Sequence, residues 1–133
     1  MNTMKILVVD DEEIVLESCE AVLEEAGFEA VLVPSADKAL EALNDDDFAL
    51  LLIDVKMPGH DGMYLIEEVK KHWSVKPVIV MSGYYTAETI NEAIRMGAAT
   101  FIAKPFEPEE LIATIKRVIE KEECHGKKES PGN

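Results

Sequence analysis

Five short apolar runs, separated by stretches with helical periodicity, constrain the fold of this sequence more than any other feature. The runs are rich in Val, Ile and Leu and contain few polar residues; they span residues 6–9, 30–33, 49–53, 78–81 and 100–103. Short runs without polar alternation are typical of strands buried on both faces of a parallel sheet. We therefore expect five parallel strands.

Between the runs, apolar residues recur every three or four positions, as in amphipathic helices. These stripes lie within residues 15–26, 36–43, 66–73, 90–97 and 111–118. Ser35 and Thr86 suit helix N-caps, Pro108 suits a first helical turn, and Gly27 and Gly97 lie where helices should end. Strictly alternating strands and helices predict a doubly wound α/β fold, (βα)5, with helices on both faces of the sheet. Periodicity alone does not give the strand order.

Length and charge limit the domain organisation and the partners. The 133 residues suit one domain, which we expect to span residues 1–122, followed by a flexible polar tail at 123–133. The net charge of −14 argues against direct binding to nucleic acid or to anionic lipid. Cys19 and Cys124 have no metal-site spacing, and no apolar run approaches the ~20 residues of a membrane span. We expect a cytoplasmic protein with no membrane contact.

Polar residues follow the predicted strands at the places where doubly wound folds carry their sites. Asp10 and Asp11 follow the first strand, Asp54 the third, Ser82 the fourth and Lys104 the fifth. Adjacent carboxylates repel one another, so we expect a cation to be bound among these aspartates at the strand ends. Hard oxygen ligands favour Mg²⁺. A carboxylate there can attack phosphorus and form an aspartyl phosphate, while an amine and a hydroxyl bind the phosphoryl oxygens.

These residues, taken together, resemble the receiver family of bacterial two-component response regulators. The resemblance is carried by the Asp10-Asp11 pair, Asp54, Ser82 and Lys104, with the sequences Met57-Pro58-Gly59-His60-Asp61-Gly62 and Lys104-Pro105-Phe106 beside them. It runs from about residue 4 to about residue 120. It implies a flavodoxin-like sheet of order 2-1-3-4-5, and receivers of nitrogen-regulation-type regulators look most similar.

The resemblance implies a role for each matching residue. Asp54 is expected to be the phosphoacceptor, and Ser82 and Lys104 are expected to bind the phosphoryl group. The cofactor is Mg²⁺, with Asp10, Asp11, Asp54 and the backbone carbonyl of Lys56 as its protein ligands. Further matches are Phe101, at the family's aromatic switch position together with Ser82, and a cis bond between Lys104 and Pro105.

The resemblance also implies partners and an output. A sensor histidine kinase or a phosphotransfer protein would supply the phosphoryl group. Phosphorylation would alter the surface of the fourth helix, fifth strand and fifth helix, at residues 86–120. That surface would bind an output domain, a partner protein or a second copy in a phosphorylation-dependent homodimer. The chain is thus expected to be no enzyme beyond its own phosphotransfer and aspartyl-phosphate hydrolysis.

Two alternative functions follow from the same residues. A Mg²⁺-dependent phosphatase of the haloacid dehalogenase type also uses an aspartate nucleophile, but it needs a second aspartate two residues later. Lys56 stands there after Asp54, and Glu12 stands there after Asp10. The other alternative is a binding module that is not phosphorylated. Such degenerate receivers normally lack one or more site residues, whereas all five are present here.

Overall fold

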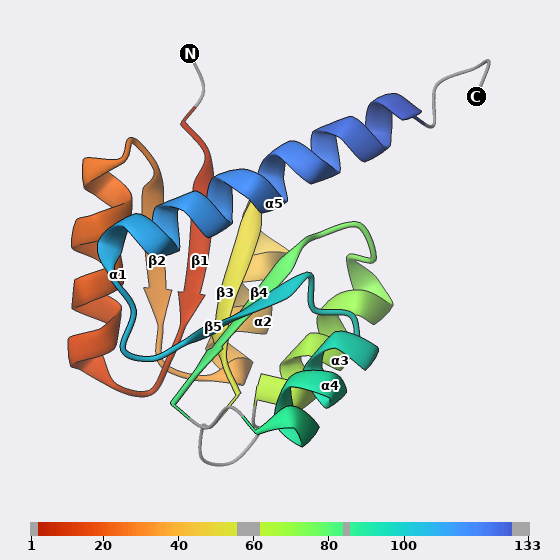
Figure 1. Cartoon of the computed structure of the whole chain (residues 1–133), viewed down its shortest axis with the longest axis horizontal. Helices are drawn as coiled ribbons and strands as arrows, with labels where there is room; N and C mark the ends of the chain where they lie inside the picture. The colour runs from red at the N-terminus through yellow and green to blue at the C-terminus, as the bar shows by residue number, and fades with distance from the viewer. Residues whose placement is uncertain (1–2, 56–61, 84–85, 129–133) are drawn as a thin grey trace.

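The computed structural model describes residues 3–55, 62–83 and 86–128, with side chains as far as residue 121. Within these residues, five strands form one parallel sheet in the order β2-β1-β3-β4-β5, as expected (Figure 1). The strands are β1 (Lys5–Val9), β2 (Glu29–Val33), β3 (Leu50–Asp54), β4 (Val78–Ser82) and β5 (Thr100–Ala103). The three central strands are buried almost throughout, which explains their unbroken apolar sequences.

The helices alternate with the strands along the chain. They are α1 (Glu13–Glu25), α2 (Ala36–Asp45), α3 (Gly62–His72), α4 (Ala87–Arg95) and α5 (Pro108–Lys128). The predicted N-caps are confirmed, because Ser35 Oγ accepts a hydrogen bond from the Lys38 N–H (3.2 Å) and Thr86 Oγ1 accepts one from the Thr89 N–H (3.1 Å). Gly27 and Gly97 follow α1 and α4 with φ of 95° and 120°, in the left-handed region that favours glycine.

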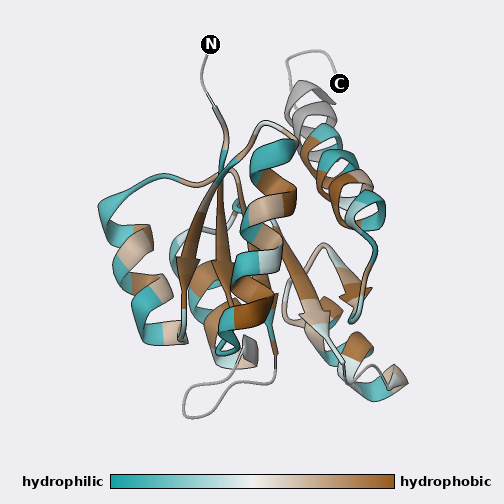
Figure 2. Ribbon diagram, turned by 90° about the vertical axis from the view of Figure 1, so that its left-hand side faces the viewer, coloured by the Kyte–Doolittle hydropathy of each residue, from teal (hydrophilic) through white to brown (hydrophobic). Residues whose placement is uncertain are grey.

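Two hydrophobic cores lie on opposite faces of the sheet. Helices α1 and α5 cover one face, and α2, α3 and α4 cover the other (Figure 1). Successive strand residues point to alternate faces, so Ile6 and Val8 pack beneath α1 and α5 whereas Leu7 and Val9 pack on the other side. Figure 2 shows the same division by hydropathy, with hydrophobic strands between helices that carry hydrophilic residues.

Helix α5 is longer than the sequence predicts. It continues to Lys128, through the first six residues of the segment expected to be a flexible tail. Six of the nine residues at 120–128 are Glu or Lys, and both residue types have a high helix propensity, so the helix can continue beyond the last residues that pack on the sheet. Among the described helices, none is long and apolar enough to cross a membrane.

Candidate functional site

The candidate site lies at the carboxyl ends of the central strands, the lower edge of the sheet in Figure 1. Asp10 follows β1, Asp54 ends β3, Ser82 ends β4 and Lys104 follows β5. The Lys104 N–H donates to the Ser82 carbonyl (2.9 Å), which continues the β4–β5 ladder by one residue. Asp10, Asp54 and Ser82 are all buried. The parallel topology thus gathers residues that are far apart in the sequence.

Lys104 lies between the two buried carboxylates at this edge and contacts both of them. Its ammonium donates to Asp10 Oδ2 (2.7 Å) and to Asp54 Oδ2 (3.1 Å). Burial alone would lower the pKa of Lys104, but the hydrogen bonds and charges of Asp10 and Asp54 outweigh it and raise that pKa above its ordinary value. The ammonium therefore stays charged at neutral pH and offsets part of the negative charge of the two carboxylates.

Three carboxylates surround the ammonium and could hold a metal ion. Asp10, Glu12 and Asp54 each offer an oxygen within 4.8 Å of the others. Hard carboxylate oxygens at one edge fit Mg²⁺, which takes few protein ligands and keeps several waters. Asp11 is exposed and lies outside this group, so its expected role as a ligand stays a prediction. The Lys56 carbonyl lies outside the described residues.

Gly62 begins α3 directly against the backbone of Asp54. A Cβ atom at Gly62 would lie 2.3 Å from the Asp54 carbonyl oxygen and 2.5 Å from Val55 Cα, too close for any side chain. The Gly62 N–H also donates to the Val55 carbonyl (3.4 Å). The glycine thus allows α3 to approach the end of β3 and fixes the backbone that carries the candidate phosphoacceptor.

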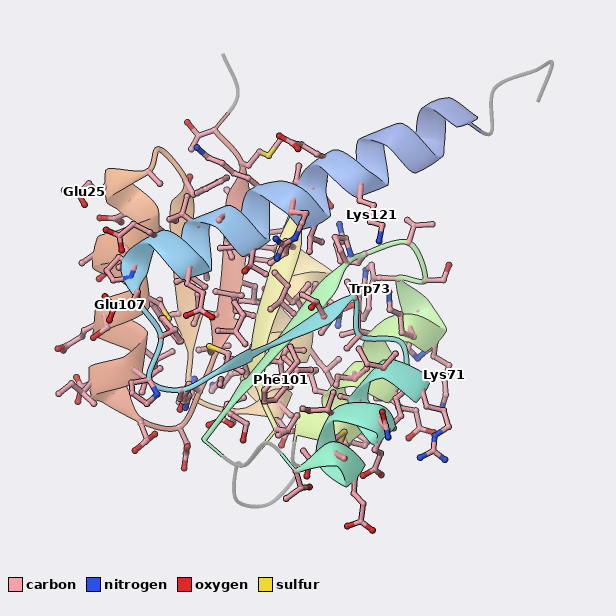
Figure 3. The ribbon with its side chains drawn as sticks, viewed as in Figure 1. Glu25, Lys71, Trp73, Phe101, Glu107 and Lys121 are labelled. Atoms are coloured by element: carbon pink, nitrogen blue, oxygen red, sulfur yellow. The ribbon has the colours of Figure 1, made fainter. Side chains whose placement is uncertain are left out.

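Phe101 lies in β5, at the edge of the sheet, and is half-buried. Its ring packs against the core under α2, α3 and α4, on the side of β5 that faces α4 in Figure 3. The position is compatible with the expected switch role, which stays a prediction. The bond between Lys104 and Pro105 is cis, as expected.

A groove beside Lys104 has a mostly apolar lining. It has a volume of about 310 Å³ and lies between α1 and the segment after β5. Its lining comprises Ile14, Val15, Ser18, Lys104, Pro105 and Phe106. Ile14 is 72% exposed, although a large aliphatic side chain is usually covered. The groove therefore offers an apolar surface that shares Lys104 with the candidate site.

Sequence reasoning gave no site role to Glu12 or Gly62. For Glu12 the only signal was its place directly after two aspartates, and its contact with Lys104 depends on how the chain turns into α1. For Gly62 the only signal was its place at the end of the sequence Met57-Pro58-Gly59-His60-Asp61-Gly62; its contact with Asp54 is a tertiary feature.

Sequence comparisons agree on one family. The family model for the response regulator receiver domain matches residues 6–116. An NtrX-like response regulator of Rickettsia bellii is 34% identical over 122 residues, which cover 90% of this chain and 26% of that protein. The transcriptional regulatory protein FixJ of Bradyrhizobium diazoefficiens is 35% identical over 125 residues, which cover 94% of this chain and 61% of that protein. The chain therefore spans only part of the length of these relatives.

Solved structures agree in fold. A CheY-like receiver domain protein from Methanospirillum hungatei is similar with a TM-score of 0.89 and 30% identity, over 93% of this chain and 99% of that one. NtrX from Brucella abortus is similar with a TM-score of 0.90 and 36% identity, over 95% of this chain and 29% of that one. The similarity thus extends over almost the whole chain and includes the edge that carries the candidate site.

Proposed function

Since this chain belongs to the response regulator receiver family, whose members are signalling modules rather than classical enzymes, we propose that Asp54 accepts a phosphoryl group from a phosphohistidine. The donor is a sensor histidine kinase or a phosphotransfer protein. The single observation that carries the proposal is the Lys104 ammonium, which contacts Asp54 (3.1 Å) and Asp10 (2.7 Å) at one buried edge. The family membership also argues against the phosphatase alternative.

The chemistry needs a nucleophile and a cationic environment. The Asp54 carboxylate oxygen forms a bond to phosphorus as the P–N bond of the phosphohistidine breaks, and the imidazole nitrogen keeps the bonding pair and takes a proton from water. Two anions must meet in this step. Lys104 reduces their repulsion through charge-assisted hydrogen bonds, and the Ser82 hydroxyl donates to a phosphoryl oxygen.

A divalent cation completes the charge balance of the proposal. Asp10 and Asp54 are its carboxylate ligands, with Asp11 and the Lys56 carbonyl as the family resemblance implies. When bound, Mg²⁺ would supply positive charge that offsets the charges of the phosphoryl oxygens and of the carboxylates that hold it. The close carboxylates of Asp10 and Asp54, with one lysine between them, support this assignment.

The phosphodonor is proposed to dock on the groove beside Lys104. A donor must bring its imidazole to Asp54, and the groove is an apolar surface that includes Lys104 itself. Ile14→Asp should weaken phosphotransfer from a histidine phosphotransfer domain that labels the wild type, without changing labelling by a small phosphodonor. If Ile14→Asp and the wild type accept the phosphoryl group from the protein donor at equal rates, the groove is not the docking surface.

The output is proposed to lie on α4, β5 and α5, the surface for an output domain, a partner protein or a second copy. A phosphoryl group on Asp54 draws the Ser82 hydroxyl inward and moves the segment after β4, and Phe101 then turns into the space beneath α4. Such exchange between two packed arrangements is how a local charge change becomes a surface change. Amide exchange with and without beryllofluoride tests this. Protection changes confined to the Asp54 pocket would refute it.

The phosphoacceptor is tested with phosphoramidate, a small donor whose P–N bond resembles that of phosphohistidine. With Mg²⁺, the wild type and the exposed-site control Asp45→Asn should each gain one acid- and base-labile phosphoryl group by intact mass. Asp54→Asn, or the wild type without Mg²⁺, should gain none. Unchanged labelling of Asp54→Asn would place the acceptor elsewhere, and an unlabelled wild type would favour the binding-module alternative.

A further inference from the structure

Glu12 is the third carboxylate near Lys104. Its Oε1 lies 3.6 Å from the Lys104 Nζ, beyond the shorter contacts that Lys104 makes with Asp10 and Asp54. The Glu12 N–H donates to Asp10 Oδ1 (2.9 Å), and Glu12 is the N-cap residue of α1, without a side-chain cap hydrogen bond. The side chain is therefore free of the capping role that its position would suggest, and it points to the lysine.

Lys104 contacts two of the three carboxylates that could hold a metal ion. Asp10 Oδ2 and Asp54 Oδ2 both accept from its ammonium. An ammonium and a divalent cation repel each other, so Mg²⁺ bound to the same two carboxylates would weaken their hold on the lysine. Because the Lys104 side chain is only 15% exposed, an ammonium that lost both partners would be partly desolvated and unpaired.

We propose that Glu12 is a positioning residue that holds the Lys104 ammonium when Asp10 and Asp54 turn their oxygens to Mg²⁺. The inference rests on the proposed function of this site. Glu12 suits the role because its carboxylate is already near the ammonium and its side chain is 61% exposed, on the solvent side of the two buried aspartates. The lysine can then move a short distance, stay paired, and remain available to a phosphoryl oxygen.

Direct ligation of the metal by Glu12 is the competing explanation, because its oxygen lies within 4.8 Å of those of Asp10 and Asp54. The two explanations differ in their dependence on Lys104. A residue that acts by holding the lysine loses its effect on Mg²⁺ affinity when the lysine is absent. A ligand keeps its effect. A double-mutant cycle between Glu12 and Lys104 therefore separates them.

The experiment is a Mg²⁺ titration followed by amide NMR for the wild type, Glu12→Gln, Lys104→Met and the double variant. Glu13→Gln, which removes one negative charge from the next and exposed residue, supplies the control for long-range electrostatics. Glu12→Gln should weaken Mg²⁺ binding about fivefold beyond the Glu13→Gln control, a typical coupling between contacting residues. In the Lys104→Met background, Glu12→Gln should weaken Mg²⁺ binding no more than Glu13→Gln does.

An equal effect of Glu12→Gln in both backgrounds would make Glu12 a ligand and overturn the inference, as would an effect no larger than that of Glu13→Gln. A wild type without measurable Mg²⁺ affinity would refute the proposed metal site and this role of Glu12 with it. If Lys104→Met does not fold, the ¹⁵N signal of the Lys104 ammonium at saturating Mg²⁺ decides. It should persist in the wild type and in Glu13→Gln and be lost to solvent exchange in Glu12→Gln; an equal signal in all three would overturn the inference.

Discussion

Replacement of Gly62 by alanine should destabilise the domain far more than the same replacement at Gly83. At Gly62 the new Cβ would lie 2.3 Å from the Asp54 carbonyl oxygen and 2.5 Å from Val55 Cα. Ordinary carbon contacts are about 3.5–4.0 Å, so backbone must shift by more than about 1 Å. At Gly83 no heavy atom of the described residues lies within 4 Å of the Cβ position, and the backbone is not in the left-handed region.

The size of the effect follows from the kind of obstacle. Overpacking costs roughly 1–3 kcal/mol, and Gly62 meets backbone rather than a flexible side chain, so about 3 kcal/mol is expected. Alanine recovers up to about 1 kcal/mol through its higher helix propensity at the start of α3. The net loss of about 2–3 kcal/mol lowers Tm by roughly 10 °C in a domain of this size. Gly83→Ala should be neutral or stabilising by up to about 1 kcal/mol, because it restricts the unfolded chain.

Thermal unfolding followed by circular dichroism measures both variants, each of which changes a glycine beside the candidate site. Gly62→Ala should also lower the rate of phosphorylation by a small donor at a temperature where it is folded, because the shift moves the Asp54 backbone. A Gly62→Ala variant that melts with the wild type, or a Gly83→Ala variant that is equally damaged, would refute the reasoning from close approach.

Three further predictions concern buried or half-buried side chains. Burial raises the pKa of the Cys19 thiol to about 11, with the charge of Asp10 adding to the effect and Lys104 opposing it. In a Cys124→Ser chain, alkylation of native Cys19 at pH 8 should therefore be about a hundredfold slower than that of an ordinary thiol, and alkylation at an ordinary rate would contradict this. Because the pKa of Lys104 is raised in the folded state, its contribution to stability is complete below pH 10.5 and is lost as pH rises through the raised value. In chemical denaturation above pH 10.5, the wild type should therefore lose more stability than Lys104→Met. Equal losses of stability in the two proteins would argue against this. Phe101→Ala should cost about 1–2 kcal/mol of folding stability because the ring is only half-buried. It should leave phosphorylation of the chain intact but reduce the change in amide exchange that beryllofluoride causes in α4. An unchanged amide-exchange response would show that Phe101 is not part of the switch.

Most of the fold could be predicted because its signals are local. The buried strands have apolar sequences, and Ser35, Thr86, Gly27 and Gly97 mark helix ends by the chemistry of one residue each. The strand order, in contrast, could not be predicted from local signals. Every crossover between parallel strands has the same local pattern, so the order came from the family resemblance rather than from periodicity.

The candidate site was predictable as far as strand ends determine it. Asp10, Asp54, Ser82 and Lys104 each adjoin a strand end, and parallel strands bring those ends to one edge. Glu12 could not be found in this way, because its contact with Lys104 depends on the turn into α1 and on a lysine 92 positions away. The length of α5 also escaped prediction, since a mostly polar stretch such as residues 120–128 suits either a solvated helix or a tail.

The central claim, that Asp54 carries the phosphoryl group, is tested most directly by chemical trapping. Borohydride reduces an aspartyl phosphate to homoserine, which marks the acceptor permanently. After treatment with acetyl phosphate and Mg²⁺, then borohydride and proteolysis, peptide sequencing by mass spectrometry should find homoserine at position 54. Homoserine at Asp10 or Asp11, or a phosphoryl group on the intact chain with no homoserine at position 54, would contradict the account.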